Sequence, residues 1–387
     1  MNPYDFARID WSRPPVHRKP IWHHQLVKPG TPLYSGSLEV DIYAETPIFV
    51  SNPRTVAPNS RDPAQFMSNA QGEYIIPGSS LKGMLRSVVE ALGNSCLTLF
   101  DGDYEHGMVN YRQRMPREFQ KCGENDKLCL ACRIFGMLKE RQGGVFLGKV
   151  NLGDACADPK KAYKYDAIYT GVLVEPKPRH EAFYLEEDKR HVAGRKFYFH
   201  HSPDHEPLTE KRLIFMGNKP ANRYIQPLDY ETSFRFRLDF TALEADEFGA
   251  LLQAIVLEDT MRHKLGYGKP LGLGSVQLSP VRLTLVDYAA RYAPTSQAGA
   301  NRGKRILEGD DMWKVLYEHA DTFTSENRSD TTRDYLSQPA MEDLRRIWRW
   351  PPEPGTAYYY PSKYEWFDTP ASQGKRISET RNVPGGR

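Results

Sequence analysis

Two stretches of alternating apolar and polar residues, each followed by a helix pattern, constrain the fold of this chain most. Residues 37–51 place Leu38, Val40 and Ile42 on one side, and residues 232–240 alternate four apolar side chains with charged ones. A period of two residues is typical of a half-buried strand. Both segments are therefore predicted to be strands that turn one face toward a core.

An amphipathic helix pattern follows each of these two strands. Apolar residues recur every three or four positions between Leu81 and Leu92, and again within 242–260. Further strands are predicted over 145–155 and from Ser275 onward. The order strand, helix, strand, strand, helix, strand, with long inserts, predicts an α+β fold with a ferredoxin-like or RRM-like sheet.

The composition fits a globular protein. The chain has 387 residues, 40% of them hydrophobic and 26% charged, which suffices to bury a core without disulfides. No apolar run reaches the ~18–20 residues of a membrane span, and the N-terminus lacks the apolar core of a signal peptide. We therefore expect a soluble, cytoplasmic protein with no membrane partner. The net charge is only +3, but the stretch from Gly107 to Lys149 alone carries nine Lys/Arg against four Asp/Glu.

Three of the five cysteines are close together in the sequence, with the spacing Cys122-x6-Cys129-x2-Cys132. A two-residue spacer lets both thiolates of a CxxC pair reach one metal ion, and a polar loop precedes this pair. A structural zinc site is the favoured interpretation, and a redox pair or ordinary thiols are the alternatives. For the fourth ligand of a tetrahedral zinc ion, His106 is the first candidate and Cys96 the second.

The helix predicted near residue 80 begins with features that suit phosphate binding. Ser79 or Ser80 can cap the helix, and Lys82 and Arg86 lie one turn apart on its exposed face. The alternative is a solvated helix face with no ligand, which this pattern taken alone favours.

The segment 266–275 is rich in glycine but matches neither standard nucleotide-binding loop. Lys269 is followed by Pro270 rather than by Ser or Thr, and a strand rather than a helix comes next. The backbone of this loop could instead pack closely on another chain or on a phosphate backbone. Its glycines are Gly266, Gly268, Gly272 and Gly274.

Two other segments suggest contacts outside the core. Residues 194–201 are aromatic and basic, which suits either RNA contact by stacking and charge or a hairpin that packs on its own core. Four of the six tryptophans lie after residue 288, which predicts that this tail packs on the main domain or on a neighbouring protein.

Four segments together resemble the RAMP superfamily of CRISPR effector subunits. Each is weak alone, but their order and spacing over residues 37–285, about two thirds of the chain, make the resemblance strong. It is closest to the backbone subunits of type III complexes, III-D-like members among them, and of type III-derived complexes. The segments are IPGSSLKGMLRS (76–87), CLACRIFG (129–136), GKVNLGDA (148–155) and GYGKPLGLGS (266–275).

Residues 1–36 are predicted to form a Pro-rich, basic arm, and residues 286–387 an extension. In both the chain departs from compact backbone subunits, whereas longer III-D-like members have such extensions. The resemblance implies an RRM-like palm over residues 37–285. The palm would carry a zinc-finger insertion at about 96–144 and a hairpin thumb at about 156–225.

The resemblance also implies RNA contacts and a cleavage residue. In target-cleaving members, an aspartate in the loop between the first strand and the helix acts on target RNA with a divalent metal. Asp62 is the candidate here, with Mg²⁺ or Mn²⁺ as its cofactor, and the alternative is a solvated aspartate that caps a turn with Pro63. The residues implied to contact RNA are Ser79, Ser80, Lys82, Arg86, Arg133, Gly266, Gly268, Lys269 and Gly272.

The expected function is that of a CRISPR effector subunit that binds CRISPR RNA and presents it to complementary target RNA. Its expected partners are these RNAs, further copies of itself and other Cas subunits. Target cleavage by this chain and a non-catalytic scaffold beside a separate nuclease are both open. A CRISPR-RNA-processing endoribonuclease with a histidine base is a further alternative, for which His191, His200 and His201 are available. The hypothesis from another class is a zinc-ribbon adaptor that binds no guide.

Overall fold

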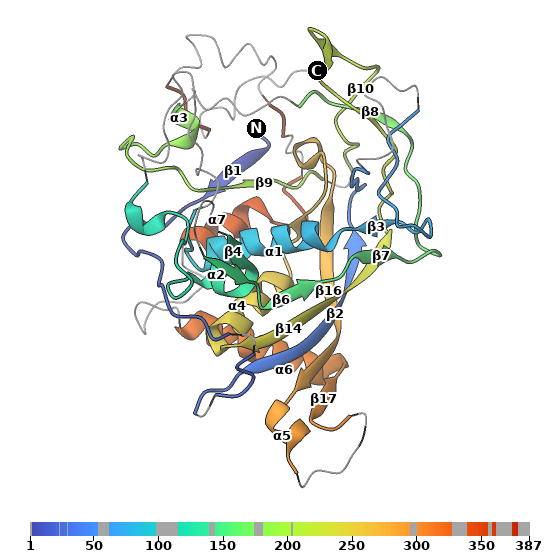
Figure 1. Cartoon of the computed structure of the whole chain (residues 1–387). Helices are drawn as coiled ribbons and strands as arrows, with labels where there is room; N and C mark the ends of the chain where they lie inside the picture. Colours follow the sequence, from blue (N-terminus) through green and yellow to red (C-terminus); the bar gives the residue numbers. More distant parts are fainter. Residues whose placement is uncertain are drawn as a thin grey trace.

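A curled antiparallel sheet organises the computed structural model of this chain (Figure 1). Its main strands, in chain order, are β2 (Tyr34–Ala44), β6 (Val150–Leu152), β7 (Ala155–Ala157), β14 (Ser233–Leu243) and β16 (Ser275–Val286). The structure describes residues 2–22, 24–28, 30–52, 62–97, 115–138, 144–173, 181–202, 204–294, 299, 301–326, 339–354, 358–360 and 374–377.

The order of these strands across the sheet differs from their order in the chain. β16 pairs with β2, β2 pairs with β14, and β14 pairs with both β6 and β7, always antiparallel. Helix α1 (Gly78–Leu92) connects β2 to the β6–β7 side, and α4 (Ala245–Val256) connects β14 to β16. The predicted α+β class is therefore confirmed, and the strand order is compatible with a ferredoxin-like fold.

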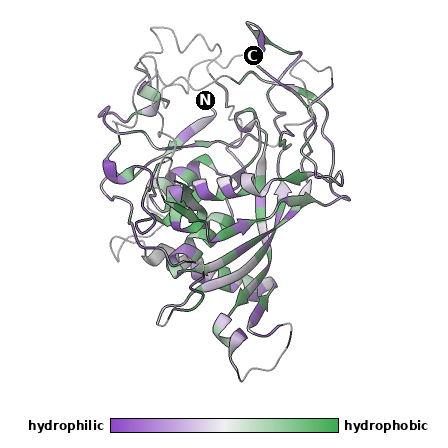
Figure 2. Ribbon diagram, in the orientation of Figure 1, coloured by the Kyte–Doolittle hydropathy of each residue, from purple (hydrophilic) through white to green (hydrophobic). Residues whose placement is uncertain are grey.

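The alternating pattern of β14 determines how this strand sits in the sheet. Phe234, Phe236 and Leu238 are at most 2% exposed, whereas Arg235 and Arg237 point away from the core with 59% of their side chains exposed. Helix α1 carries both hydrophobic and hydrophilic residues (Figure 2) and turns its apolar stripe inward. Because of these two periodicities, the apolar face of the sheet packs against the apolar side of the helices.

The strand predicted over 145–155 is in fact three short strands. β5 (Val145–Leu147) pairs with β4 (Gly136–Leu138), whereas β6 and β7 pair with β14. Gly148 lies at the break, where a Cβ atom would be 2.6 Å from the carbonyl oxygen of Phe135. Gly148 thus packs closely against Phe135, at the end of the helix that precedes β4. At this point the segment leaves the β4–β5 pair and joins the main sheet.

The predicted arm and extension both join the main fold. β1 (Tyr4–Ala7) pairs with β9 (Arg195–Tyr198), and β17 (Lys304–Leu307) adds to the sheet beside β16. Helix α6 (Gly309–Glu326) packs on α4, and α7 (Pro339–Ile347) packs on β1 and α1. The main hydrophobic cluster accordingly extends from Ala7 to Tyr358, and includes Trp348 from the tryptophan-rich tail.

The remaining elements are short. β8 forms a small sheet with β10 and β13, and β11 pairs with β12, so the described part of the predicted thumb combines these small β units with α3 and β9. No helix in the described residues is long and apolar enough to cross a membrane. The remaining short elements are β3 (Ile75–Ile76), η2 (Arg117–Phe119), α2 (Leu130–Phe135), β8 (Ile168–Thr170), α3 (Glu181–Tyr184), β10 (Thr209–Glu210), β11 (Phe215–Met216), β12 (Lys219–Pro220), β13 (Tyr224–Ile225), β15 (His263–Lys264), η3 (Lys269–Leu271) and α5 (Tyr288–Tyr292).

Candidate functional site

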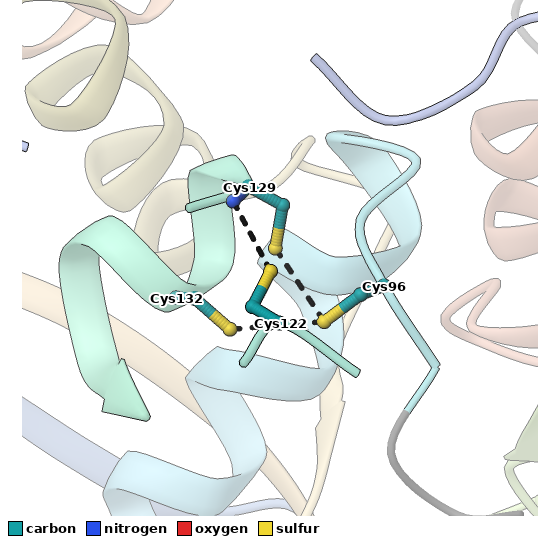
Figure 3. A group of neighbouring side chains, drawn as sticks. All are labelled: Cys96, Cys122, Cys129 and Cys132. Carbon is teal, nitrogen blue, oxygen red and sulfur yellow. Dashed lines mark hydrogen bonds between the residues drawn. The ribbon is translucent and has the colours of Figure 1, made fainter. Parts of the chain in front are cut away.

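Four buried cysteines converge between the end of α1 and the start of α2 (Figure 3). Cys96 follows α1, Cys129 directly precedes α2, and Cys132 lies within that helix. The sulfur of Cys96 is 3.7 Å from that of Cys132 and 3.6 Å from that of Cys129, and all four sulfurs lie within 4.8 Å of one another. Because a tetrahedral zinc ion with Zn–S bonds of about 2.3 Å holds its sulfurs about 3.8 Å apart, this group could bind a metal such as zinc.

Hydrogen-bond donors contact two of the four sulfurs, those of Cys122 and Cys132. The backbone N–H of Cys129 donates to the sulfur of Cys122 at 3.4 Å, and the Arg86 guanidinium donates to the sulfur of Cys132 at 3.5 Å. A hydrogen bond with Cys122 also raises the pKa of His17. Since four thiolates exceed the charge of one divalent ion, these donors would stabilise the surplus negative charge.

The structure brings Cys122, Cys129 and Cys132 together, and Cys96 is the fourth member of the group. His106, the first candidate for the fourth ligand, lies outside the described residues. The CxxC pair does open a helix, as redox pairs do, but two further cysteines lie at ligand distance and no disulfide joins any of the four. This donor set suits a closed tetrahedral metal site better than a redox pair.

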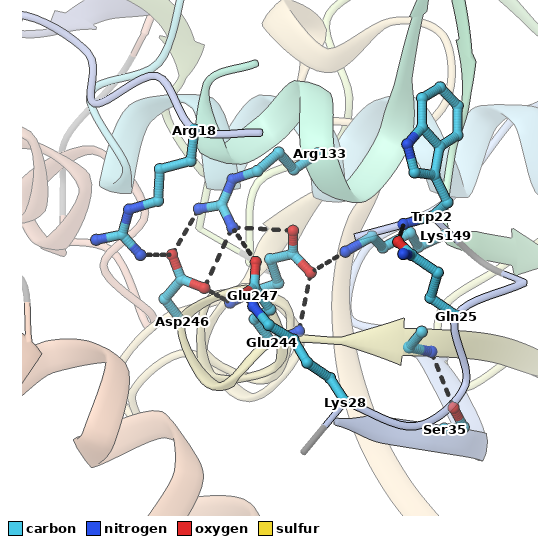
Figure 4. Close-up of polar contacts among 11 residues, drawn as sticks. Arg18, Trp22, Gln25, Lys28, Ser35, Arg133, Lys149, Glu244, Asp246 and Glu247 are labelled. Carbon is cyan, nitrogen blue, oxygen red and sulfur yellow. Dashed lines mark hydrogen bonds and ion pairs between the residues drawn. The ribbon is translucent and has the colours of Figure 1, made fainter. Parts of the chain in front are cut away.

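Arg133 follows the cysteines on α2 and is buried among carboxylates (Figure 4). Its guanidinium donates to Asp246 at 2.5 Å and to Glu247 at 2.9 Å, and Glu247 also accepts from the Lys149 ammonium at 2.6 Å. Burial acts to raise the pKa of Asp246, but the hydrogen bond and charge of Arg133 outweigh it and lower that pKa. With 2% of its side chain exposed, Arg133 connects α2 to α4, and this placement argues against the RNA contact that the resemblance implies for it.

A cavity of about 520 Å³ lies between α1, β9 and the glycine-rich loop. Three lysines reach its wall, Lys196 from β9, Lys264 from β15 and Lys269 from η3, and α1 contributes the hydroxyls of Ser80 and Ser87. Among the described residues, no aspartate or glutamate lines the cavity. The wall therefore carries positive charge and hydroxyl donors without a compensating carboxylate.

The three lysines have neutral partners. Lys264 and Lys269 each donate to a carbonyl oxygen of the glycine-rich loop at 3.0 Å, and the ammonium of Lys196 lies 3.8 Å from the centre of the Tyr4 ring. Burial lowers the pKa of Lys196 to about 8, and burial together with the charge of Lys269 lowers the pKa of Lys264 to about 7. An anion in the cavity would favour the charged form of each lysine, so the cavity is suited to anion binding.

The glycines of the loop serve mainly to fold the loop itself. Gly266 has φ +86°, and a Cβ atom there would lie 2.5 Å from the carbonyl oxygen of Phe49. Gly266 and Lys269 line the cavity, whereas Gly268 and Gly272 are buried inside the loop. The close backbone approach inferred from the sequence is thus to the chain's own backbone at Gly266.

The start of α1 differs from the prediction. Pro77 precedes the helix, no side chain of the capping residue bonds to it, and the Gly78 N–H instead donates to the Asp154 carboxylate at 2.8 Å. The predicted serine cap is therefore wrong, and an acidic side chain already lies at the positive end of this helix. Ser80 faces the cavity, whereas Ser79 is exposed beside it.

The two cations of α1, Lys82 and Arg86, have different surroundings. Lys82 is half-buried, and burial, followed by the charge of Arg86, lowers its pKa. Arg86 donates to the Glu90 carboxylate at 2.8 Å and to the sulfur of Cys132, so it faces the cysteine group and not the cavity. An RNA contact at Lys82 stays a prediction, and the geometry makes Arg86 a support of the cysteine group.

Asp62 is exposed at a bend between β2 and α1. Within the described residues, two groups of side chains lie close enough to share a metal ion, the four cysteines and a loop cluster of Glu186, Asp188 and His191. Asp62 belongs to neither group, so nothing supports Mg²⁺ or Mn²⁺ at this position. Its role in cleavage stays a prediction.

Two of the three histidines considered for RNA processing are buried. The ring nitrogens of His200 lie 2.8 Å from the Ser275 hydroxyl and 3.0 Å from the carbonyl oxygen of Arg262. Burial lowers the pKa of His201 to about 3 and also lowers that of His200. His200 and His201 are therefore part of the packed interior, and neither is accessible to act as a general base on RNA.

Lys196, Lys264 and Tyr267 also line the cavity, and none of them is among the single residues predicted to contact RNA. Lys196 belongs to the aromatic and basic segment 194–201, for which RNA contact was one of two interpretations. Lys264 lies two residues before the glycine-rich loop, so extending that motif by a few residues would have included it.

The part of the chain that forms these sites matches the sequence model of a protein family. The sequence model of the RAMP superfamily matches residues 41–277, which is more than half of the chain. This range contains the four cysteines, the carboxylate partners of Arg133 and the three cavity lysines. No curated protein matches the chain. The family match shows that the chain belongs to the RAMP superfamily.

Proposed function

We propose that this chain is a CRISPR-associated subunit that holds guide RNA in the cavity between α1, β9 and the glycine-rich loop. Membership of the RAMP superfamily supports a CRISPR-associated RNA-binding subunit. The observation that carries the proposal is the cavity wall, with three lysines, serine hydroxyls and no acidic side chain among the described residues. Contacts of cations and hydroxyls with phosphates supply much of the affinity of proteins for RNA.

The open face of the sheet is less suited to RNA than the cavity. Arg235 forms an ion pair with Asp41 at 2.6 Å, and Arg237 forms one with Asp239 at 2.8 Å. These two arginines are thus already neutralised by carboxylates on the same sheet. RRM domains bind RNA on the sheet through exposed aromatic rings, whereas β14 here exposes arginines.

Binding through the phosphates would leave the base edges of the guide accessible. Because phosphate contacts fix position without reading sequence, a guide held in this way can pair with complementary target RNA. In this proposal the four cysteines hold a structural zinc ion that fixes α1 against α2, and the metal takes part in no chemical step.

Replacing Lys264 and Lys269 by glutamine is expected to weaken binding of CRISPR RNA at least about tenfold. The dependence of log affinity on log salt should also become shallower, by about 0.7 for each phosphate of single-stranded RNA that the variant no longer neutralises. Burial lowers the pKa of Lys264 to about 7, so this lysine loses its positive charge as the pH rises. The affinity of the wild type for RNA should therefore fall between about pH 6 and about pH 9. Fluorescence anisotropy over a salt and pH series measures all three effects.

The matched control for this experiment is Lys314→Gln, which removes an exposed lysine on α6 outside the cavity. It should leave both affinity and salt dependence close to the wild-type values. Wild-type affinity in a folded Lys264→Gln, Lys269→Gln protein would place the guide elsewhere on the chain.

Asp62→Ala is expected to abolish any Mg²⁺- or Mn²⁺-dependent cleavage of complementary target RNA and to leave RNA affinity unchanged. Asp62 is exposed in the segment between β2 and α1 and does not line the cavity. Cleavage of labelled target by guide-loaded protein, with EDTA as the metal-free reference, measures the effect. Glu73→Gln, at another exposed acid of the same segment, serves as the control. Full cleavage by Asp62→Ala would move the chemistry to another residue, and uncleaved target with wild type would favour the scaffold.

A further inference from the structure

The sheet ends in a protrusion formed by α5, the end of β16 and β17. Figure 1 shows it at the opposite end of the molecule from β1 and the labelled N-terminus. We refer to residues 287–294 and 301–307 as the tyrosine protrusion. None of these residues lines the cavity that we propose for guide RNA.

Two tyrosines form a parallel pair on this protrusion. The rings of Tyr288 and Tyr292 have centroids 6.2 Å apart and an angle of 6° between their planes. Tyr292 is 72% exposed, although a large aromatic side chain usually buries much of its surface. The pair therefore presents an aromatic face to solvent.

Hydrogen bonds hold this pair in place. The Asp287 carboxylate accepts from the Ala290 N–H at 3.0 Å and caps α5, and the Asp287 N–H donates to the carbonyl oxygen of Gly303 at 2.8 Å. The Arg291 guanidinium donates to the carbonyl oxygen of Arg302 at 3.2 Å. The tyrosines thus stand on a short helix that is fixed to the strand beside it.

The residues of the tyrosine protrusion carry a net positive charge. Four cationic side chains accompany them, against the single carboxylate of Asp287. Lys304 and Arg305 are exposed, and no ion pair joins either of them to a carboxylate in the described part of the chain. The cations of the tyrosine protrusion are Arg291, Arg302, Lys304 and Arg305.

We propose that the tyrosine protrusion is a second RNA-binding surface, which stacks bases of single-stranded RNA on Tyr288 and Tyr292 and pairs phosphates with Lys304 and Arg305. Stacking on aromatic rings and charge pairing along the backbone are the two contacts that bind single strands without sequence preference. Protein interfaces also use tyrosine, but they are depleted of lysine at their centre. Arginine is enriched in protein interfaces as well, so RNA is favoured by the exposed Lys304 and by the excess of four cations over one carboxylate in the tyrosine protrusion.

The test uses the full chain and two labelled single-stranded RNAs of about ten nucleotides, oligoadenylate and an abasic strand with the same backbone. Tyr288→Ala with Tyr292→Ala should lower the affinity for oligoadenylate by about tenfold or more, while the affinity for the abasic strand stays the same. Lys304→Glu with Arg305→Glu should lower both affinities and flatten the salt dependence. Tyr292→Phe, which keeps the ring, should bind oligoadenylate like wild type.

Matched controls come from α6, where Tyr317→Ala removes another exposed tyrosine and Lys314→Glu reverses another exposed charge. All measurements are repeated in the Lys264→Gln, Lys269→Gln background. A loss caused by the tyrosine variant in both backgrounds supports a surface separate from the cavity. The cavity proposal would fail in a different way. The Lys264→Gln, Lys269→Gln protein, with both tyrosines intact, would then bind CRISPR RNA with wild-type affinity.

Equal binding of oligoadenylate by wild type and the double tyrosine variant would overturn the proposal. So would a tyrosine variant that binds RNA normally but no longer co-purifies with other subunits of its complex, since the protrusion would then be a protein interface. Photo-crosslinking of thiouridine-substituted RNA gives an independent result. It should label a peptide containing residues 288–292 in the wild type, and the absence of that label would also overturn the proposal.

Discussion

Replacing both Cys129 and Cys132 by serine is expected to unfold the region around α1 and α2 and to lower the melting temperature of the whole chain. Both sulfurs are fully buried and belong to the main hydrophobic cluster. Structural zinc in small finger peptides binds with an apparent free energy of roughly 10–16 kcal/mol. A protein domain is stable by only about 5–15 kcal/mol, so losing even part of the metal contribution removes much of the stability.

The measurement combines metal analysis with thermal melting. The wild-type chain should contain about one zinc ion, and a strong chelator should lower its melting temperature as the double serine variant does. Cys156→Ser is the control, because Cys156 is exposed on β7 and lies outside the four-cysteine group. A double variant that melts like the wild type, or a wild type without metal, would contradict the zinc site.

The central strands and helices could be predicted because their signals are local. The alternation in 232–240 lies within β14, and the strand predicted from Ser275 onward begins there as β16, directly after the glycines. The break at Gly148 and the cap of α1 were not predictable in this way. The first depends on contact with Phe135, and the second on Asp154, which lies 76 residues after Gly78 in the sequence.

The candidate sites show the same difference between residues with a local sequence signal and residues whose partners are distant in the sequence. Cys122, Cys129 and Cys132 share a spacing that a metal ion explains, whereas Cys96 reaches them only because α1 packs beside α2. Arg133 has its partner Asp246 at a separation of 113 residues. No local pattern distinguishes a cation with a distant buried partner from one that faces solvent, so the sequence held no sign against the RNA contact that the resemblance implies for Arg133.

Arg133→Ala is expected to destabilise the folded chain by about 3–5 kcal/mol. The substitution leaves Asp246 and Glu247 without their buried guanidinium, and an unpaired charge in such a place costs several kcal/mol. Glu247 would retain the Lys149 ammonium at 2.6 Å, whereas Asp246 would keep the Glu247 N–H at 2.9 Å and the exposed Arg18 guanidinium at 3.3 Å. Urea denaturation of variant and wild type measures the difference in the free energy of unfolding.

Arg235→Ala is the matched control, because Arg235 is an exposed arginine whose ion pair with Asp41 lies on the open face of the sheet. Surface pairs of this kind contribute about 0–1 kcal/mol, so its effect should be small. A double variant, Arg133→Met with Asp246→Asn, removes both charges and should be destabilised by less than the sum of its two single variants. If Arg133 instead bound RNA, Arg133→Ala would keep the stability of the wild type and lose RNA affinity. The burial of its guanidinium among carboxylates predicts the opposite: the main loss should be in stability, and at temperatures where the variant is folded its RNA affinity should be retained.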